Sequence, residues 1–175
     1  MTVPFQKVRT MSDSFAHLRN FRQVTPTFAT SGQPKEEDLK AIADAGYEVV
    51  INLALHNDPR YSLADEAGTV ASLKMTYIHI PVQFDNPTVE NMNAFFDAVD
   101  QHKDRKLWVH CAANYRVTAF VGLYRVMREG WERDRAFELM NSVWAPEDYP
   151  AAFQAWTVFI ERQLISGSMN CGSTL

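Results

Sequence analysis

The residues best suited to chemistry lie in one short stretch, Lys106 to Arg116, which reads KLWVHCAANYR. An apolar run ends in His110 and Cys111, and Arg116 follows just before a second apolar, helix-like stretch. A cysteine in a turn that opens a helix lies among backbone N–H groups that lack a helical partner and favour negative charge. Such a thiol tends to ionise, and the thiolate is the nucleophile. We therefore expect the segment Cys111 to Arg116, the cysteine loop, to bind anions and carry a nucleophile.

The elements that must position this loop alternate between short β-rich runs and longer helical patterns, which indicates an α/β fold. After an extended region at about 21–30, strands are predicted at 49–55, 77–82 and 107–110. Helices are predicted at 34–46, 62–74, 89–99, 117–127, 132–143 and 150–163. Strands joined by helices should be parallel, so we expect a mostly parallel sheet flanked by helices, with ligands binding beyond the carboxyl ends of its strands. Asp58, Asp85 and Cys111 all follow strands at that edge.

The length of 175 residues predicts a single domain. We place an N-terminal extension at 1–20, the domain at 21–165 and a flexible tail at 166–175, which contains Cys171. The two cysteines stand at no metal-type spacing with a histidine and cannot organise a disulfide framework, and the role of Cys171 stays open. His56, His79 and His102 also lack ligand spacing, so we expect neither a metal nor a cofactor.

Charge and hydropathy exclude several kinds of partner. The net charge of -4 argues against a nucleic-acid surface, which is normally basic. No apolar run approaches the roughly 20 residues that span a bilayer, so no membrane partner is expected. Residues 1–20 mix charged with apolar side chains and lack the continuous apolar centre of a secretory signal, which predicts a cytoplasmic protein.

The strand, His110 and Cys111, the short loop, Arg116 and the following helix resemble the signature loop of the cysteine-dependent protein tyrosine phosphatase superfamily. The segments 30–34 (TSGQP), 50–53 (VINL) and 80–82 (IPV) are similar to small bacterial phosphatase-like domains, the beta-lactamase-hydrolase-like phosphatases. This resemblance covers about 21–160. It implies a single-domain phosphatase-like fold and hydrolysis of a phosphomonoester through a phosphocysteine intermediate. The substrate would be a phosphorylated small molecule or protein, and the oligomeric state stays undetermined.

Phosphate chemistry explains the residue types of the loop. Cys111 would attack phosphorus, while convergent donors hold the phosphoryl oxygens and stabilise the transition state. His110 would brace the loop from beneath by hydrogen bonding, and Thr118 would help the thiolate to leave. Asn114 suits a backbone position with positive φ. The donors of the phosphate site would come from Ala112, Ala113, Asn114, Tyr115 and Arg116.

A phosphatase also needs an acid that protonates the leaving oxygen. Asp85 is the leading candidate because it stands just past a predicted strand and 26 residues before Cys111. In the competing interpretation, Asp85 or Asn86 caps the next helix. Asp58 is a second candidate, although its segment also reads as a plain turn. Glu147 and Asp148 are further candidates that would otherwise serve as first-turn helix charges.

The loop departs from the phosphatase signature in its length. Four residues separate Cys111 from Arg116, whereas the signature has five, and Val117 stands where a hydroxyl residue normally follows the arginine. Four-residue spacing is instead similar to the loops of rhodanese sulfurtransferases, which carry a cysteine persulfide. Two alternatives therefore stay open beside phosphatase activity. One is sulfur transfer through a Cys111 persulfide, and the other is an oxyanion-binding module without turnover.

Overall fold

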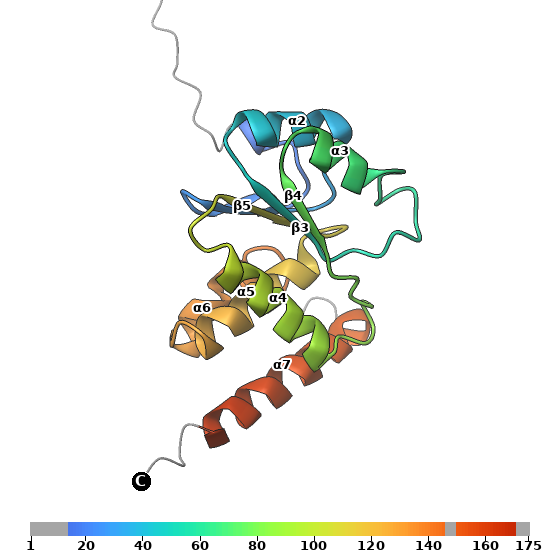
Figure 1. Ribbon diagram of the computed structural model, residues 1–175. Coiled ribbons are helices and arrows are strands. Elements are labelled where there is room, and N and C mark those ends of the chain that lie inside the picture. Colours follow the sequence, from blue (N-terminus) through green and yellow to red (C-terminus); the bar gives the residue numbers. More distant parts are fainter. Residues whose placement is uncertain (1–13, 146–149, 171–175) are drawn as a thin grey trace, which may run out of the picture.

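The computed structural model describes residues 14–145 and 150–170, and a five-stranded sheet forms its centre (Figure 1). The strand order is β1-β2-β5-β3-β4. Strand β1 pairs antiparallel with β2, and the other neighbouring strands are parallel, which confirms the expected mostly parallel sheet. The strands are β1 (Arg22–Thr25), β2 (Phe28–Ser31), β3 (Val49–Asn52), β4 (Thr76–His79) and β5 (Leu107–His110).

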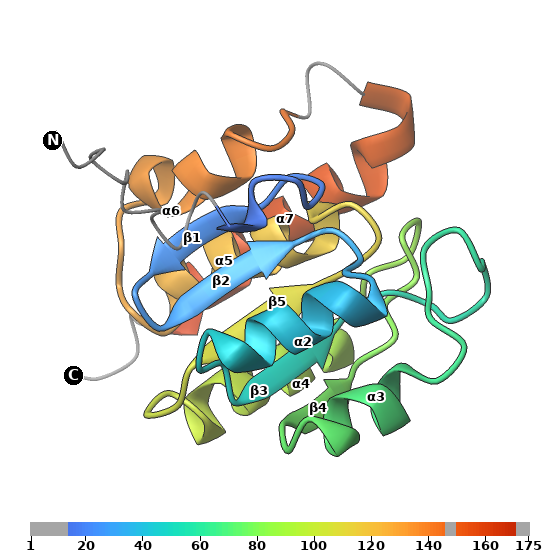
Figure 2. The same cartoon turned by 90° about the horizontal axis from the view of Figure 1, so that it is seen from above.

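Helices cover both faces of the sheet. On one face lie α2 (Glu36–Asp44) and α3 (Glu66–Ser72). On the other lie α4 (Val89–Gln101), α5 (Tyr115–Met127), α6 (Arg133–Asn141) and α7 (Pro150–Asn170). Figure 2 shows the sheet from the side of α2, with β2, β5 and β3 next to one another. None of the described helices is both long and apolar enough to cross a membrane.

Alternation along β3 and β5 divides the core into two clusters. Val50 and Trp108 point to the face covered by α2 and α3, where they pack with Leu39 and Ile42. The neighbouring strand residues point to the other face and pack with helices α4 to α7. Because β5 is buried on both faces, it reads as a continuous apolar run. The core cluster between the sheet and helices α4 to α7 includes Val49, Ile51, Leu107, Val109, Phe95, Phe96, Val117, Phe120, Phe153 and Trp156.

Several element boundaries differ from the sequence-based expectation. Strand β3 ends at Asn52 rather than at 55, because the Asn52 side chain accepts a hydrogen bond from the Ala54 N–H (2.7 Å) and turns the chain. Helix α2 begins at Glu36 with Lys35 as its N-cap, so Pro34 lies outside the helix. Helix α3 begins at Glu66 rather than at 62, because Asp65 caps it by accepting from Gly68 N–H.

Both expected domain ends also shift. Phe15 and Leu18 are buried in the cluster around Trp108, and the Phe15 ring meets the Trp108 ring edge-on at 4.9 Å. The packed unit therefore starts before Phe21, since these apolar side chains cover one face of the sheet. At the other end, α7 continues to Asn170, and Leu164 packs against the core. Residues 166–170 are thus helical rather than part of a flexible tail, and Cys171 lies outside the described residues.

Candidate active site

The cysteine loop connects β5 to α5 and is held by the adjacent strand β2. The Cys111 N–H donates to the Ser31 carbonyl (3.3 Å), and the Gln33 N–H donates to the Ala112 carbonyl (3.3 Å). Gly32 permits this close approach, because a Cβ at that position would lie 2.9 Å from the Ala112 carbonyl oxygen. Main-chain hydrogen bonds with Ser31 and Gln33 therefore anchor the loop.

Asn114 holds the end of the loop in a left-handed conformation. Its φ is +67°, which confirms the expected positive φ, and the residue is the N-cap of α5. The Asn114 amide donates to the Asn20 carbonyl (2.7 Å) and to Thr30 Oγ1 (2.9 Å). In return, the Asn20 amide donates to the Ala113 carbonyl (2.9 Å). A segment expected to be an extension thus braces the cysteine loop.

Two substitutions at Asn114 separate the backbone contribution from the side-chain contribution. Asn114→Gly removes the two hydrogen bonds of the side-chain amide but keeps positive φ accessible. Asn114→Ala removes the same hydrogen bonds and also makes positive φ unfavourable. We expect Asn114→Ala to lower the free energy of unfolding by about 1 to 2 kcal/mol more than Asn114→Gly. Urea unfolding followed by tryptophan fluorescence measures this difference. Equal stability of the two variants would show that the left-handed conformation costs nothing in this loop.

The loop presents a set of unpaired main-chain donors. Among the described residues, no hydrogen bond is found for the N–H groups of Ala112, Ala113 and residues 115–117. The first bond of α5 runs from the Thr118 N–H to the Asn114 carbonyl (3.1 Å). Free amides at the start of a 13-residue helix attract negative charge, through their N–H groups and through the helix dipole. The backbone thus has the donors that an oxyanion requires.

Arg116 adds a fixed cation to these amides. Its Nε donates to the Val82 carbonyl (2.9 Å), and its guanidinium lies 5.1 Å from the centroid of the Phe84 ring. None of the ion pairs among the described residues includes Arg116. Because Nε is already bound, the terminal Nη groups remain as donors for a ligand, in the fork geometry that suits phosphate.

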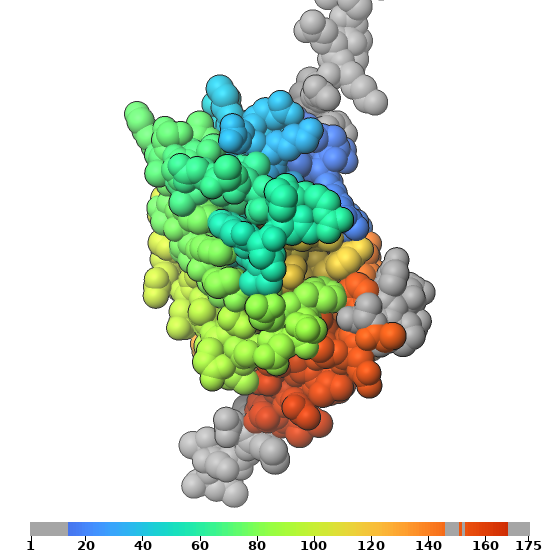
Figure 3. Space-filling model, turned by 90° about the vertical axis from the view of Figure 1, so that its right-hand side faces the viewer, coloured from blue at the N-terminus to red at the C-terminus, as the bar shows by residue number. Residues whose placement is uncertain are grey.

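A pocket of about 290 Å³ opens over the loop and joins part of the predicted site. Ala112 and Arg116 line it together with Asp58 and Asp85, so the segments after β3, β4 and β5 meet here as expected. Figure 3 shows this face of the molecule, with the segment after β3 above and the segment after β4 below. Cys111 is fully buried and is not among the residues that line the pocket. The complete lining is Ala54, Leu55, Asn57, Asp58, Tyr61, Gln83, Phe84, Asp85, Ala112 and Arg116.

The candidate acids differ sharply in their surroundings. Asp85 is exposed, and no hydrogen-bond partner of its carboxylate is found in the described part of the chain. The helix-cap interpretation is wrong, because Thr88 caps α4 by accepting from the Asn91 N–H (3.2 Å). Hydrogen bonds from Arg60 hold the pKa of Asp58 below its usual range, so Asp58 is a poor proton donor. Glu147 and Asp148 lie outside the described residues.

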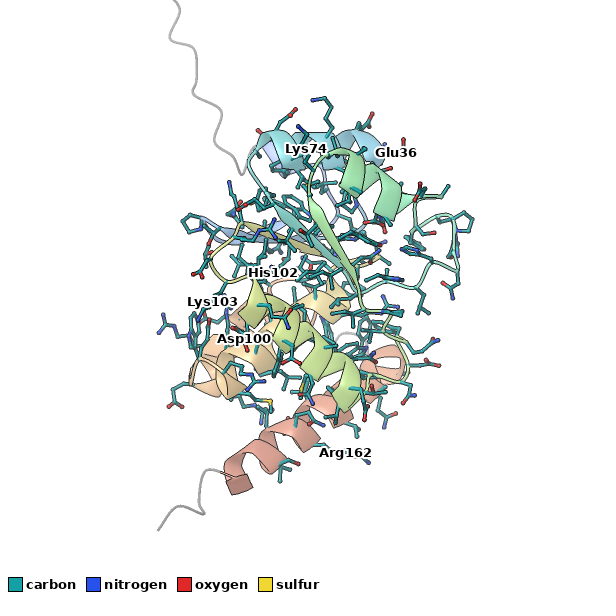
Figure 4. The ribbon with its side chains drawn as sticks, in the orientation of Figure 1. Glu36, Lys74, Asp100, His102, Lys103 and Arg162 are labelled. Carbon is teal, nitrogen blue, oxygen red and sulfur yellow. The ribbon has the colours of Figure 1, made fainter. Side chains whose placement is uncertain are left out.

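Thr118, His56, His79 and His102 are not among the residues that line the pocket. The Thr118 hydroxyl donates to the Asn114 carbonyl (2.9 Å) and receives a bond from Trp144 Nε1 (3.2 Å), so it stabilises the start of α5. These hydrogen bonds give no geometric support to the expectation that Thr118 helps the thiolate to leave. His102 stands beside Lys103 at the end of α4, away from the cysteine loop (Figure 4). His56 and His79 stack on each other at 4.2 Å instead.

The structure also reveals a buried acid that sequence reasoning missed. His110 is fully buried, and its Nε2 lies 2.5 Å from Oε1 of Glu66, the first residue of α3. Burial raises the pKa of Glu66, but the charge and hydrogen bond of His110, with a further bond from Gln33, outweigh burial and lower it. At sequence level Glu66 resembles an ordinary first-turn charge, and only its burial distinguishes it.

Comparisons with known proteins agree with this geometry. The sequence profile of a family described as "DSP-PTPase phosphatase fused to NAD+ Kinase" matches residues 3–149. A phosphatase-like DUF442 protein of Shewanella putrefaciens CN-32 has 31% identity over 90% of this chain and 96% of its own, with a TM-score of 0.72. Among proteins with curated descriptions, none matches this chain.

Two more distant structures show the same fold. TpbA of P. aeruginosa, solved in complex with pTyr, has 14% identity over 85% of this chain and 90% of its own, with a TM-score of 0.62. PTPMT1 has 14% identity over 85% of this chain and 99% of its own, with a TM-score of 0.64. These matches confirm the phosphatase-like α/β fold that the cysteine loop predicts.

Proposed function

Because the chain belongs to the family of DSP-PTPase phosphatases fused to NAD+ kinase, we propose that it is a phosphatase that uses Cys111 to hydrolyse a phosphomonoester. One observation carries the proposal. The buried Cys111 is followed along the chain by unpaired amides and by Arg116, whose Nη groups have no carboxylate partner among the described residues, and Ala112 and Arg116 line one pocket. A phosphoryl group fits such a set, because its oxygens accept from the amides and from the guanidinium fork.

The proposed reaction has two steps. In the first, the Cys111 thiolate forms an S–P bond while the bond from phosphorus to the leaving oxygen breaks, and Asp85 gives its proton to that oxygen. In the second, Asp85 takes a proton from water, whose oxygen attacks phosphorus and displaces the thiolate. Inorganic phosphate leaves, and enzyme and proton are restored. Arg116 and the loop amides stabilise the phosphoryl oxygens in both transition states.

The role of Asp85 predicts a dependence on the leaving group. Asp85→Asn should lower kcat about 10²-fold or more for alkyl phosphates, whose leaving oxygen needs a proton. For an aryl phosphate with an acidic phenol, the rate of the first step should fall much less, because that leaving oxygen needs no proton. Kinetics over a series of aryl and alkyl phosphates measure this trend.

The matched control for this experiment is Asp58→Asn. Asp58 lines the same pocket, but Arg60 keeps it ionised, so we expect its replacement to change kcat less than about threefold for every leaving group. A large loss in Asp58→Asn with none in Asp85→Asn would assign the acid to Asp58 instead. If the rate of the first step fell equally for all leaving groups, Asp85 would not be the acid of that step.

The four-residue loop favours one further candidate, sulfur transfer through a Cys111 persulfide. This reaction would release thiocyanate from thiosulfate and cyanide and would add one sulfur atom to Cys111. The phosphatase proposal expects neither result. A module that binds oxyanions without turnover would instead bind phosphate through Arg116 and hydrolyse no ester.

A further inference from the structure

A second pocket lies at the end of the sheet opposite the cysteine loop. Its volume is about 240 Å³, and it is lined by Leu107, the first residue of β5, whereas the cysteine loop follows the last residue of that strand. Val121 and Tyr124 line it from the second half of α5, and Phe28 lines it from the start of β2. None of its described lining residues also lines the pocket over the cysteine loop. The two pockets are therefore separate.

The walls of this second pocket are mostly apolar. Val99 of α4 and Val121 of α5 are buried and form part of them. Trp131 forms another part, and the guanidinium groups of Arg125 and Arg135 lie over its ring, at 4.6 Å and 4.3 Å from the centroid. An apolar cavity of about 150 Å³ is large enough to bind benzene. The second pocket therefore has room for a ligand with one ring and a short polar group.

Arg125 supplies this pocket with a cation that has no acceptor. Among the described residues, its half-buried guanidinium forms neither a hydrogen bond nor an ion pair. An arginine stays charged at neutral pH, so its N–H groups remain as donors for a ligand. The carboxyl end of α5 would oppose an anion, but the Tyr124 and Arg125 carbonyls already accept from the N–H groups of Arg128 and Trp131.

The other charged residues of the second pocket determine which anion suits it. Lys103, just past the end of α4, adds a second cation that forms no ion pair with the described residues (Figure 4). Arg105 is already engaged, because it pairs with the Glu48 carboxylate (3.5 Å) and donates to the Glu48 carbonyl (3.2 Å). Glu129 is the one acid among the described lining residues, and its charge opposes a dianion. A single negative charge therefore suits this pocket best.

We propose that the second pocket binds a small arylalkanoic acid, a monoanion with one apolar ring. The ring packs against Trp131 and the aliphatic walls, and the carboxylate accepts hydrogen bonds from Arg125. A guanidinium can hold a carboxylate with two parallel hydrogen bonds, and such charge-assisted bonds are stronger than neutral ones. The site is separate from the cysteine loop, so the inference goes beyond the proposed function and does not depend on it.

Two probes of nearly equal shape test the proposal on the parent protein. Phenylacetate carries the negative charge, and phenylacetamide is its neutral counterpart. NMR titration of isotope-labelled protein gives the Kd of each probe from the indole N–H signal of Trp131. We expect a Kd of about 1 mM for phenylacetate and a Kd at least about tenfold higher for phenylacetamide. Equal Kd values for the two probes, or no shift of the Trp131 signal, would overturn the proposal.

Arg125→Met removes the charge but keeps an unbranched apolar side chain. It should raise the Kd of phenylacetate at least about tenfold and change that of phenylacetamide less than about twofold. Arg135→Met is the matched control, because Arg135 also lies over Trp131 but does not line the pocket. It should change both Kd values less than about twofold. Equal losses of phenylacetate binding in the two variants would contradict a specific role of Arg125.

A third variant distinguishes the second pocket from the cysteine loop, which also has donors for an anion. Arg116→Ala should change the Kd of phenylacetate less than about twofold, because Arg116 lines only the pocket over the loop. Loss of phenylacetate binding in Arg116→Ala but not in Arg125→Met would place the probe at the cysteine loop and refute the proposal. If Arg125→Met fails to fold, the comparison of the two probes on the parent protein still decides.

Discussion

Cys111→Ser is expected to lower phosphomonoester hydrolysis by about 10⁴-fold or more. Serine has nearly the same volume as cysteine, so the buried position and the contacts of the loop should persist. Its hydroxyl stays protonated at neutral pH and is a far weaker nucleophile than a thiolate. Steady-state kcat/KM with an aryl phosphate measures the loss.

Anion binding provides the control for this variant. The loop amides and Arg116 do not depend on the thiol, so phosphate should bind Cys111→Ser with an affinity within a few-fold of the parent protein. Calorimetry with inorganic phosphate measures it. Full activity of Cys111→Ser would remove Cys111 as the nucleophile, and loss of both activity and binding would point to a damaged loop.

Arg116→Lys should produce the second large effect, a loss of about 10²- to 10³-fold in kcat. Arg116 is anchored through Nε on the Val82 carbonyl and lies against Phe84, which directs its two Nη groups as a rigid fork. Lysine keeps the charge but loses both the anchor and the bidentate geometry. The expected loss in kcat thus tests geometry rather than charge, and steady-state kinetics with an aryl phosphate measures it.

Arg60→Lys is the corresponding control. Arg60 pairs with Asp58 on the rim of the same pocket and is exposed, so its replacement should change kcat less than about twofold. If Arg116→Lys were as active as Arg60→Lys, the bidentate role of Arg116 would be refuted. If Arg116→Lys kept its kcat but bound phosphate more weakly, Arg116 would act in ground-state binding and not in transition-state stabilisation.

The sequence predicted the part of the site that depends on local signals. The apolar run 107–110 is bounded by the cysteine loop, and strand β5 has these same limits. Asn114 takes the positive φ that its residue type favours. Asp85 and Arg116 reach one pocket because parallel strands end at a common edge. In each case, neighbours along the chain or the topology of the sheet determine the outcome.

The contacts that the sequence did not predict are long-range. Glu66 and His110 are 44 residues apart, and neither periodicity nor composition indicates that α3 delivers a carboxylate below β5. Asn20 braces Asn114 across 94 residues, although its segment was expected to lie outside the domain. Side-chain competition also decided local details, since Thr88 rather than Asp85 caps α4.

The most direct test of the central claim is to trap the covalent intermediate. The Asp85→Asn variant should form the S–P bond with an aryl phosphate but hydrolyse it slowly, because water then lacks its base. After an acid quench, mass spectrometry should find one added phosphoryl group on the peptide that contains Cys111. Continued turnover without a phosphoryl group on Cys111, or with one on another residue, would contradict the account.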